Sequence, residues 1–258
     1  MHALARLADE APEGREDLVH MVIDVLCAYL RMPYTPRPDA LSEQPDQPVL
    51  PLASPTAVDL SRLRSTEPDD TRCEKQQAAQ EEHRRRVLEF ESFQQVRHTI
   101  IRIIGNRLRE PTRWRGKNYD FTGVVFDGGD LSGARFSDGP VNFRRARFSG
   151  GEVDFSEADF TGEWVDFNGA RFSGGRVNFL GARFSGGTVD FGGARFSGGE
   201  VDFNGASGER PRGLPADAGC GDSEVVHLPE PWLSDTGHDR GQDDRSTPDE
   251  DTPDPEES

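Results

Sequence analysis

Cysteine, methionine, tryptophan and tyrosine are scarce in this chain, with three of each in 258 residues. The cysteines are odd in number and far apart, so they define neither a disulfide framework nor a metal-binding spacing, and we expect a reducing compartment. Long apolar runs are lacking too: the longest, at 21–30, contains Asp24 and is too short to cross a bilayer. Because no basic stretch followed by an apolar one opens the chain, a signal peptide is not predicted, and we expect a cytoplasmic location.

Basic residues are also few relative to acidic ones. Lysine and arginine number 30 against 47 acidic residues, which gives a net charge of −17, and only 33% of the residues are hydrophobic. Residues 207–258 alone carry four basic and fifteen acidic side chains. This distribution favours solubility and argues against direct binding of nucleic acid or of an anionic membrane. We expect 207–258 to be an acidic and mostly disordered tail.

The N-terminal part contains helical patterns separated by prolines. Residues 1–32 are predicted to be a helical segment, in which Leu18, Val22 and Leu26 recur at helical spacing. Its apolar faces are broad and need a partner, and one hypothesis is that this partner is missing from the chain. Residues 33–71 contain eight prolines and are predicted to be a linker.

Residues 72–118 are predicted to contain a third helix and a lead-in to the next domain. The first half of this helix is highly charged, as in a coiled coil, and its second half carries an isoleucine stripe that we expect to cap the domain that follows. His98 lies among apolar residues there and is interpreted as a packing residue. The six histidines show no metal-binding or catalytic spacing, and the glycines form no phosphate-binding loop. We therefore predict no catalytic residue, no metal site and no cofactor.

Phenylalanine, by contrast, is abundant, and 14 of its 16 copies fall on one repeat within 119–206. The first four positions of the repeat are five residues apart, and the spacing then alternates between seven and five. A small or branched apolar residue lies two residues before each position, with one exception. Disordered Phe-Gly segments have no reason to keep two apolar positions in register, so the repeat is structural. The predicted core positions are Phe121, Phe126, Leu131, Phe136, Phe143, Phe148, Phe155, Phe160, Phe167, Phe172, Phe179, Phe184, Phe191, Phe196 and Phe203.

This spacing also predicts the backbone geometry. Residues two apart in an extended segment point to the same side, so each five-residue unit is a short strand followed by a corner. Glycine or a small polar residue at the corner permits a tight turn. Units that cannot bury their apolar side alone must stack, as in a solenoid. From residue 139 onward two extra residues enter every second corner, and we expect a bulged corner outside the core.

The units ARFSG at 146–150, VDFSE at 153–157 and ADFTG at 158–162 resemble those of pentapeptide-repeat proteins. The resemblance covers 119–206 and implies a right-handed quadrilateral β-helix, a β-solenoid, with four faces in each coil. Fifteen units at four to a coil make about four coils. The resulting fold class is α+β, with N-terminal helices, a β-solenoid and the acidic tail.

The N-terminal stretches support a narrower resemblance. They read HALARLADEAPEGREDLVHMVIDVLCAYLRMPY, VRHTIIRIIGNRL and FTGVVFDGG, and they resemble an actinobacterial group of pentapeptide repeat-containing proteins that typically carry transmembrane helices upstream. The resemblance implies either a lost anchor or a start codon assigned too late. A membrane-associated location follows only if the true start lies upstream.

In this geometry the residue before each core position points outward. Two opposite faces then present aspartate or asparagine, one is mixed, and one presents arginine. The candidate interaction face consists of Arg147, Arg171, Arg195 and Trp164. We expect a non-catalytic scaffold or protein-interaction module with an unidentified protein partner, a homodimer being one alternative.

Two other functions stay open at this point. The resemblance implies that a member of the family can mimic DNA and inhibit or protect a type II topoisomerase, although a short solenoid with an arginine row is poorly suited to that role. The other alternative is a truncated fragment of a membrane-anchored protein. Finally, the apolar residues of 225–233 are expected either to cap the last coil, which we favour, or to form a short linear motif.

Overall fold

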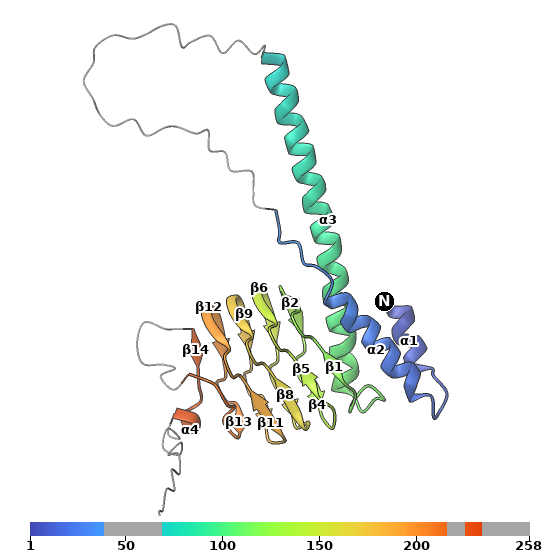
Figure 1. Ribbon diagram of the computed structural model, residues 1–258, viewed down its shortest axis with the longest axis vertical. Helices are drawn as coiled ribbons and strands as arrows, with labels where there is room; N and C mark the ends of the chain where they lie inside the picture. The colour runs from blue at the N-terminus through green and yellow to red at the C-terminus, as the bar shows by residue number, and fades with distance from the viewer. Residues whose placement is uncertain (39–68, 216–224, 234–258) are drawn as a thin grey trace, which may run out of the picture.

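The computed structural model describes residues 1–38, 69–215 and 225–233 (Figure 1). Most of the predicted linker, and the part of the predicted tail beyond 233, lie outside these described residues. The helices in the described part are α1 (His2–Asp9), α2 (Glu16–Leu30), α3 (Asp69–Arg109) and α4 (Glu230–Leu233). In Figure 1 the first half of α3 projects away from the rest of the molecule, and its second half lies against the first coil of a β-solenoid.

Short parallel strands build the solenoid. They are β1 (Tyr119–Asp120), β2 (Val125–Phe126), β3 (Gly129–Asp130), β4 (Arg135–Phe136), β5 (Val141–Asn142), β6 (Arg147–Asp154), β7 (Asp159–Phe160), β8 (Trp164–Asp166), β9 (Arg171–Asn178), β10 (Arg183–Phe184), β11 (Thr188–Asp190), β12 (Arg195–Asp202), β13 (Ser207–Gly208) and β14 (Val226–His227). They form three sheets with the orders β1-β5-β8-β11, β4-β7-β10-β13 and β2-β6-β9-β12-β14, and β3 also pairs with β6. The predicted solenoid of about four coils is thereby confirmed.

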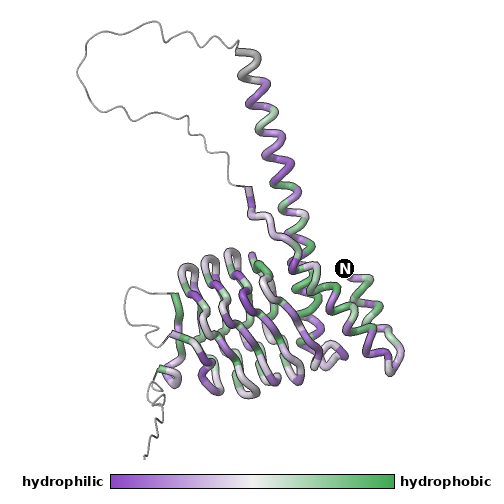
Figure 2. The backbone as a smooth tube through the Cα atoms, viewed as in Figure 1, coloured by the Kyte–Doolittle hydropathy of each residue, from purple (hydrophilic) through white to green (hydrophobic). Residues whose placement is uncertain are grey.

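From β3 onward, residues 24 positions apart occupy equivalent places in neighbouring coils, whereas β1 and β2 pair with residues 22 positions later. Val165, for example, pairs with Val141 on one side and with Val189 on the other. Fourteen of the fifteen core positions of the repeat are at most 2% exposed, and Phe196 is partly buried. Figure 2 shows the hydrophobic residues recurring along every coil. The repeat of twelve residues is therefore half a coil, and the solenoid interior is filled by phenylalanine.

The phenylalanines stack in four columns that run along the solenoid. Within a column the ring centroids of successive coils lie 4.5 to 5.2 Å apart. The columns are Phe121, Phe143, Phe167 and Phe191; Phe126, Phe148, Phe172 and Phe196; Phe155, Phe179 and Phe203; and Phe136, Phe160 and Phe184. Offset aromatic stacking adds to the stabilisation that burial provides.

At every second insertion the bulged corner lies inside a longer strand. In β6, β9 and β12 strand pairing continues on both sides of the insertion, with a shift of register at the insertion itself, so two of the four faces join into one sheet. Gly175, in the middle of β9, has a φ of 70°, and a Cβ there would lie 2.1 Å from the carbonyl oxygen of Gly151. Glycine is needed because neighbouring coils touch through their backbones at this corner.

Both ends of the solenoid are covered. At the first coil, α3 packs so closely on β3 that a Cβ at Gly129 would lie 2.8 Å from Ile101. The apolar stripe of α2 is buried in the same core, where α2 contacts both α3 and β1, so the chain itself supplies a partner for this helix. At the last coil β14 pairs with β12, and the ring of Trp232 packs against Phe184 and Phe203. Residues 225–233 thus cap the solenoid.

Candidate interaction surface

Arg147, Arg171 and Arg195 form a row across three coils. They are the first residues of β6, β9 and β12, and strand pairing places Arg147 beside Arg171 and Arg171 beside Arg195. Each is exposed, and each is followed by a phenylalanine that points into the core. Because neighbouring strands are about 4.8 Å apart, the three residues lie on a line about 10 Å long. We call them the arginine row.

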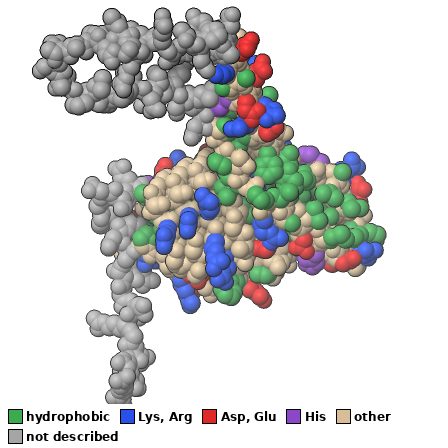
Figure 3. Space-filling view, turned by 45° about the horizontal axis from the view of Figure 1, so that its top comes forward, with side chains coloured by type: hydrophobic (Ala, Val, Ile, Leu, Met, Phe, Trp, Pro, Cys, Tyr) green, Lys and Arg blue, Asp and Glu red, His purple; other side chains and the backbone are tan. Residues whose placement is uncertain are grey.

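The positive charge of the arginine row is unpaired within the part of the chain that the structure describes. Among the described residues, no carboxylate lies within ion-pairing distance of these three guanidinium groups. Arg176, by contrast, lies 3.4 Å from Glu200 and 3.2 Å from Asp202, measured between charged atoms. Figure 3 shows basic side chains lined up across the coils on the face turned to the viewer. Like charges held side by side repel each other. The arginine row is therefore a strip of positive charge, unpaired among the described residues, on a chain whose net charge is negative.

The aspartate and asparagine rows on either side have a structural task. In each of these residues the side-chain oxygen Oδ1 accepts a hydrogen bond from the backbone N–H two residues further on, over 2.7 to 3.0 Å. The residues are Asp120, Asp130, Asn142, Asp154, Asp166, Asn178, Asp190 and Asp202. These Asx turns close the corners of the coil. The sequence pattern placed these side chains on the surface but did not indicate this role.

A second row of outward residues behaves differently. Arg135, Asp159 and Arg183 are also in register, on the sheet formed by β4, β7, β10 and β13. Here a carboxylate stands between two guanidinium groups, so the charges alternate along the row. The mixed face predicted from the sequence therefore has alternating charges, with one carboxylate between two guanidinium groups, unlike the arginine row.

Trp164 lies apart from the arginine row. It is the first residue of β8, where it pairs with Thr188 in the sheet β1-β5-β8-β11, and 51% of its surface is exposed. The arginine row belongs to the sheet that contains β6, β9 and β12. The structure thus brings the three predicted arginines together and places the predicted tryptophan on another sheet.

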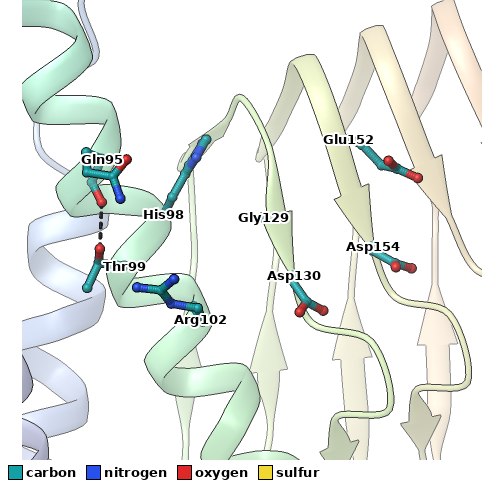
Figure 4. A pocket seen from close by; sticks show the side chains of 8 residues that line it. All are labelled: Gln95, His98, Thr99, Arg102, Gly129, Asp130, Glu152 and Asp154. Atoms are coloured by element: carbon teal, nitrogen blue, oxygen red, sulfur yellow. Dashed lines mark hydrogen bonds between the residues drawn. The ribbon is translucent and has the colours of Figure 1, made fainter.

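A cleft of about 480 Å³ lies between α3 and the solenoid, beside the place where they pack together. It is lined by Gln95, His98, Thr99 and Arg102 of the helix and by Gly129, Asp130, Glu152 and Asp154 of the coils. Figure 4 shows the side chains of Glu152 and Asp154 pointing away from the helix. Asp130 is engaged by Arg109 and by the hydroxyl of Ser132. The polar groups do not converge on one point, so the cleft offers no arrangement for catalysis.

Asp127 joins the helices to the first coil. It is 8% exposed, and its carboxylate accepts hydrogen bonds from Gln94 at 2.9 Å, from Tyr34 at 3.2 Å and from His98 at 3.2 Å. Burial disfavours the charged form, but the hydrogen bonds from His98, Gln94 and Tyr34 outweigh it and lower the pKa of Asp127. His98 is therefore a partner of this carboxylate.

Arg97 is the second buried polar residue at this junction. It is 1% exposed, donates hydrogen bonds to the carbonyl oxygens of Leu30 and Val125, and lies over the rings of Tyr34 and Phe93. Desolvation by burial lowers the pKa of Arg97. It connects α2, α3 and the first coil, and the sequence had not singled it out. Its position inside the isoleucine stripe of α3 was the available signal.

Other chemistry is sparse in the described ranges. No group of three or more His, Cys, Asp or Glu side chains there is placed to hold a metal ion. Cys27 is buried, and burial raises the pKa of its thiol to about 12, which makes it unreactive as a nucleophile at neutral pH. None of the helices among these residues has the length and hydropathy that a membrane crossing requires.

Parallel coils of five-residue faces with phenylalanine inside define a class of solenoid proteins. A family model described as pentapeptide repeats (9 copies) matches residues 121–171 and 138–188. The solenoid of this chain is therefore built of pentapeptide repeats, as in pentapeptide-repeat proteins. No curated protein and no solved structure matches the chain. The narrower resemblance to an actinobacterial group with upstream membrane helices stays a prediction.

Proposed function

We propose that this pentapeptide-repeat protein is a non-catalytic interaction module whose solenoid presents the arginine row to a protein partner. One observation carries the proposal: three exposed arginines stand in register without a described carboxylate to neutralise them. The sheet that carries these arginines is held rigid by the columns of stacked phenylalanine on its inner side. A rigid surface loses little conformational entropy on binding, and arginine is enriched at protein interfaces.

The alternative of DNA mimicry has less support. A mimic needs a continuous negative surface, because duplex DNA carries one charge per about 1.7 Å. The aspartates of this solenoid are engaged at its corners, asparagine replaces aspartate at two of the eight positions, and the arginine row lies between them. These features favour an interaction module over a mimic.

Affinity capture tests the proposal. Immobilised wild-type protein and a variant with Arg147→Gln, Arg171→Gln and Arg195→Gln are incubated with a lysate of the source cell, and the retained proteins are identified by mass spectrometry. We expect proteins that the wild type retains and the triple variant loses. Identical retention by both would contradict the proposal. A supercoiling assay with gyrase, run in parallel, is expected to show no inhibition at equimolar protein, and inhibition there would favour the mimic.

A further inference from the structure

We infer that the arginine row recognises a short, extended acidic segment of a protein, in which acidic residues alternate with other residues. This inference rests on the proposed function and names the chemistry of the partner. Arginine pairs with carboxylates through two parallel N–H···O bonds, which gives both strength and direction to such a contact. Three arginines in line therefore present a linear series of carboxylate sites.

The spacing of the row suits an extended peptide. The three strands place the arginine backbones about 4.8 Å apart, so the row spans about 10 Å. In an extended peptide, alternate side chains lie on the same side and recur about every 6.8 Å, so three alternating carboxylates span roughly 13 Å. The long arginine side chains can splay outward by the small difference, which also relieves their mutual repulsion.

The surroundings of the row limit the width of its partner. On one side lie Asn142, Asp166 and Asp190, and on the other lie Glu152, Arg176 and Glu200, where the charge of Arg176 is paired with Glu200 and Asp202. The basic strip is thus about one side chain wide. A single peptide strand with its carboxylates on one edge can bind it without approaching these acids.

A nucleic acid or an anionic membrane fits this strip poorly. Both carry closely spaced negative charge over a wide area and need a broad basic surface. The chain has a net charge of −17, which repels an extended polyanion at long range. Arg144 and Arg145 are both exposed at the corner before Arg147, but Arg144 lies 3.7 Å from the carboxylate of Asp166, so Arg145 is the one of the two that adds unpaired charge to the strip. It extends the strip by one more cation but does not widen it along its length.

The repeat offers a matched control for the test. Arg171 and Arg183 each stand in an identical pentapeptide, ARFSG, at 170–174 and 182–186. Both arginines are exposed, but Arg183 belongs to the row of alternating charge, where it stands beside Asp159. A substitution at Arg183 therefore removes the same side chain from the same local sequence on a different face.

Fluorescence anisotropy with the full chain measures the predicted binding. The probe is a labelled peptide of three glutamates alternating with serines, and the control peptide has glutamine in place of glutamate. We expect the triple variant Arg147→Gln, Arg171→Gln and Arg195→Gln to weaken binding at least about tenfold, since several charge-assisted contacts are lost. Arg183→Gln should leave the affinity unchanged, and the glutamine peptide should not bind. Equal weakening by Arg183→Gln, or no binding of the glutamate peptide, would overturn the inference.

Two further arms separate the possible failures. A single-stranded oligonucleotide of equal charge is expected to bind more weakly than the peptide, and tighter binding through the row would overturn the inference in favour of nucleic acid. The acidic peptide is then added to the affinity capture described above, where it should displace the retained partner. If the triple variant loses the partner but the peptide does not displace it, the proposed function stands and this inference falls. If retention does not depend on the row, both fall. Circular dichroism of each variant confirms that the solenoid is intact.

Discussion

The ring of Phe172 stacks on that of Phe148 with centroids 4.7 Å apart and planes 2° from parallel, directly beneath the arginine row. Phe196 continues the column on the other side at 4.8 Å. Phe172 is 1% exposed, whereas Phe196 near the end of the solenoid is partly buried. The same residue type thus occupies an interior place and an end place in one column.

Phe172→Ala should destabilise the protein by about 3–5 kcal/mol, because it removes a buried ring and leaves a cavity between two coils. Phe196→Ala should cost less, since its ring is only partly buried. Urea unfolding followed by circular dichroism measures both. Equal losses would contradict the idea that interior coils carry most of the stability. Phe172→Asp should abolish the strand signal, and an unchanged spectrum and melting curve would count against the stacked core.

Two substitutions of Asp166, at a corner of the coil, distinguish the contribution of its charge from that of its hydrogen bond. Its Oδ1 accepts the N–H of Asn168 at 2.7 Å, and the residue is 7% exposed. Asp166→Asn keeps the acceptor and should be nearly neutral, because Asn142 makes the same turn one coil earlier. Asp166→Ala leaves the partly buried N–H of Asn168 without this acceptor and should cost about 1 kcal/mol. Equal effects of the two substitutions in urea unfolding would show that the charge matters instead.

The turns at Gly169 and Arg145 are equivalent positions in neighbouring coils. Both have positive φ, 67° at Gly169 and 54° at Arg145, in a conformation that costs a residue with a Cβ about 1–2 kcal/mol. Gly169→Ala should therefore lower the melting temperature, and Arg145→Gly should raise it slightly. The glycine substitution also frees the unfolded chain, so its gain is expected to be smaller than the loss from Gly169→Ala. If both substitutions shifted the melting temperature in the same direction, the idea that Arg145 is strained by its positive φ would be wrong.

We expect the contact between the N-terminal helices and the first coil to weaken at low pH, because Asp127 becomes protonated. Its pKa lies below the ordinary value of 3.8 in the folded protein, so the stability that it contributes is present above that value and is lost as the pH falls through the lowered pKa. Asp127→Asn should be less stable than the wild type at pH 7, by about 1 kcal/mol or more, and this difference should shrink as the pH falls through the lowered pKa of Asp127. Urea unfolding at a series of pH values tests this. Parallel pH profiles would contradict the prediction.

The solenoid could be predicted in detail because its signal is repeated. A core position such as Phe167 is indicated by its own type, by the residue two before it and by its equivalents 24 residues away. The junction of Arg97 and Asp127 has no such redundancy, because each occurs once and the two meet only after the helix packs on the first coil. The position of Trp164 was missed for a related reason: it lies in an insertion, where the order of faces around the coil decides which neighbours it meets.

The two halves of a coil differ in structure. In one half, an eight-residue strand joins two faces, and in the other half the faces are separate short strands. One corner of each of these coils is a bulge at a pair of glycines inside a longer strand, and Trp232, which follows the last coil, fits against the columns of Phe184 and Phe203. A gene for such a protein can therefore gain or lose length in steps of 24 codons. Each such step adds or removes one whole coil, so the capping residues still meet the same phenylalanine columns. A step of twelve codons keeps the reading frame and the repeat but sets the end of the chain over the wrong columns. Variation in the length of related solenoids should follow the larger step.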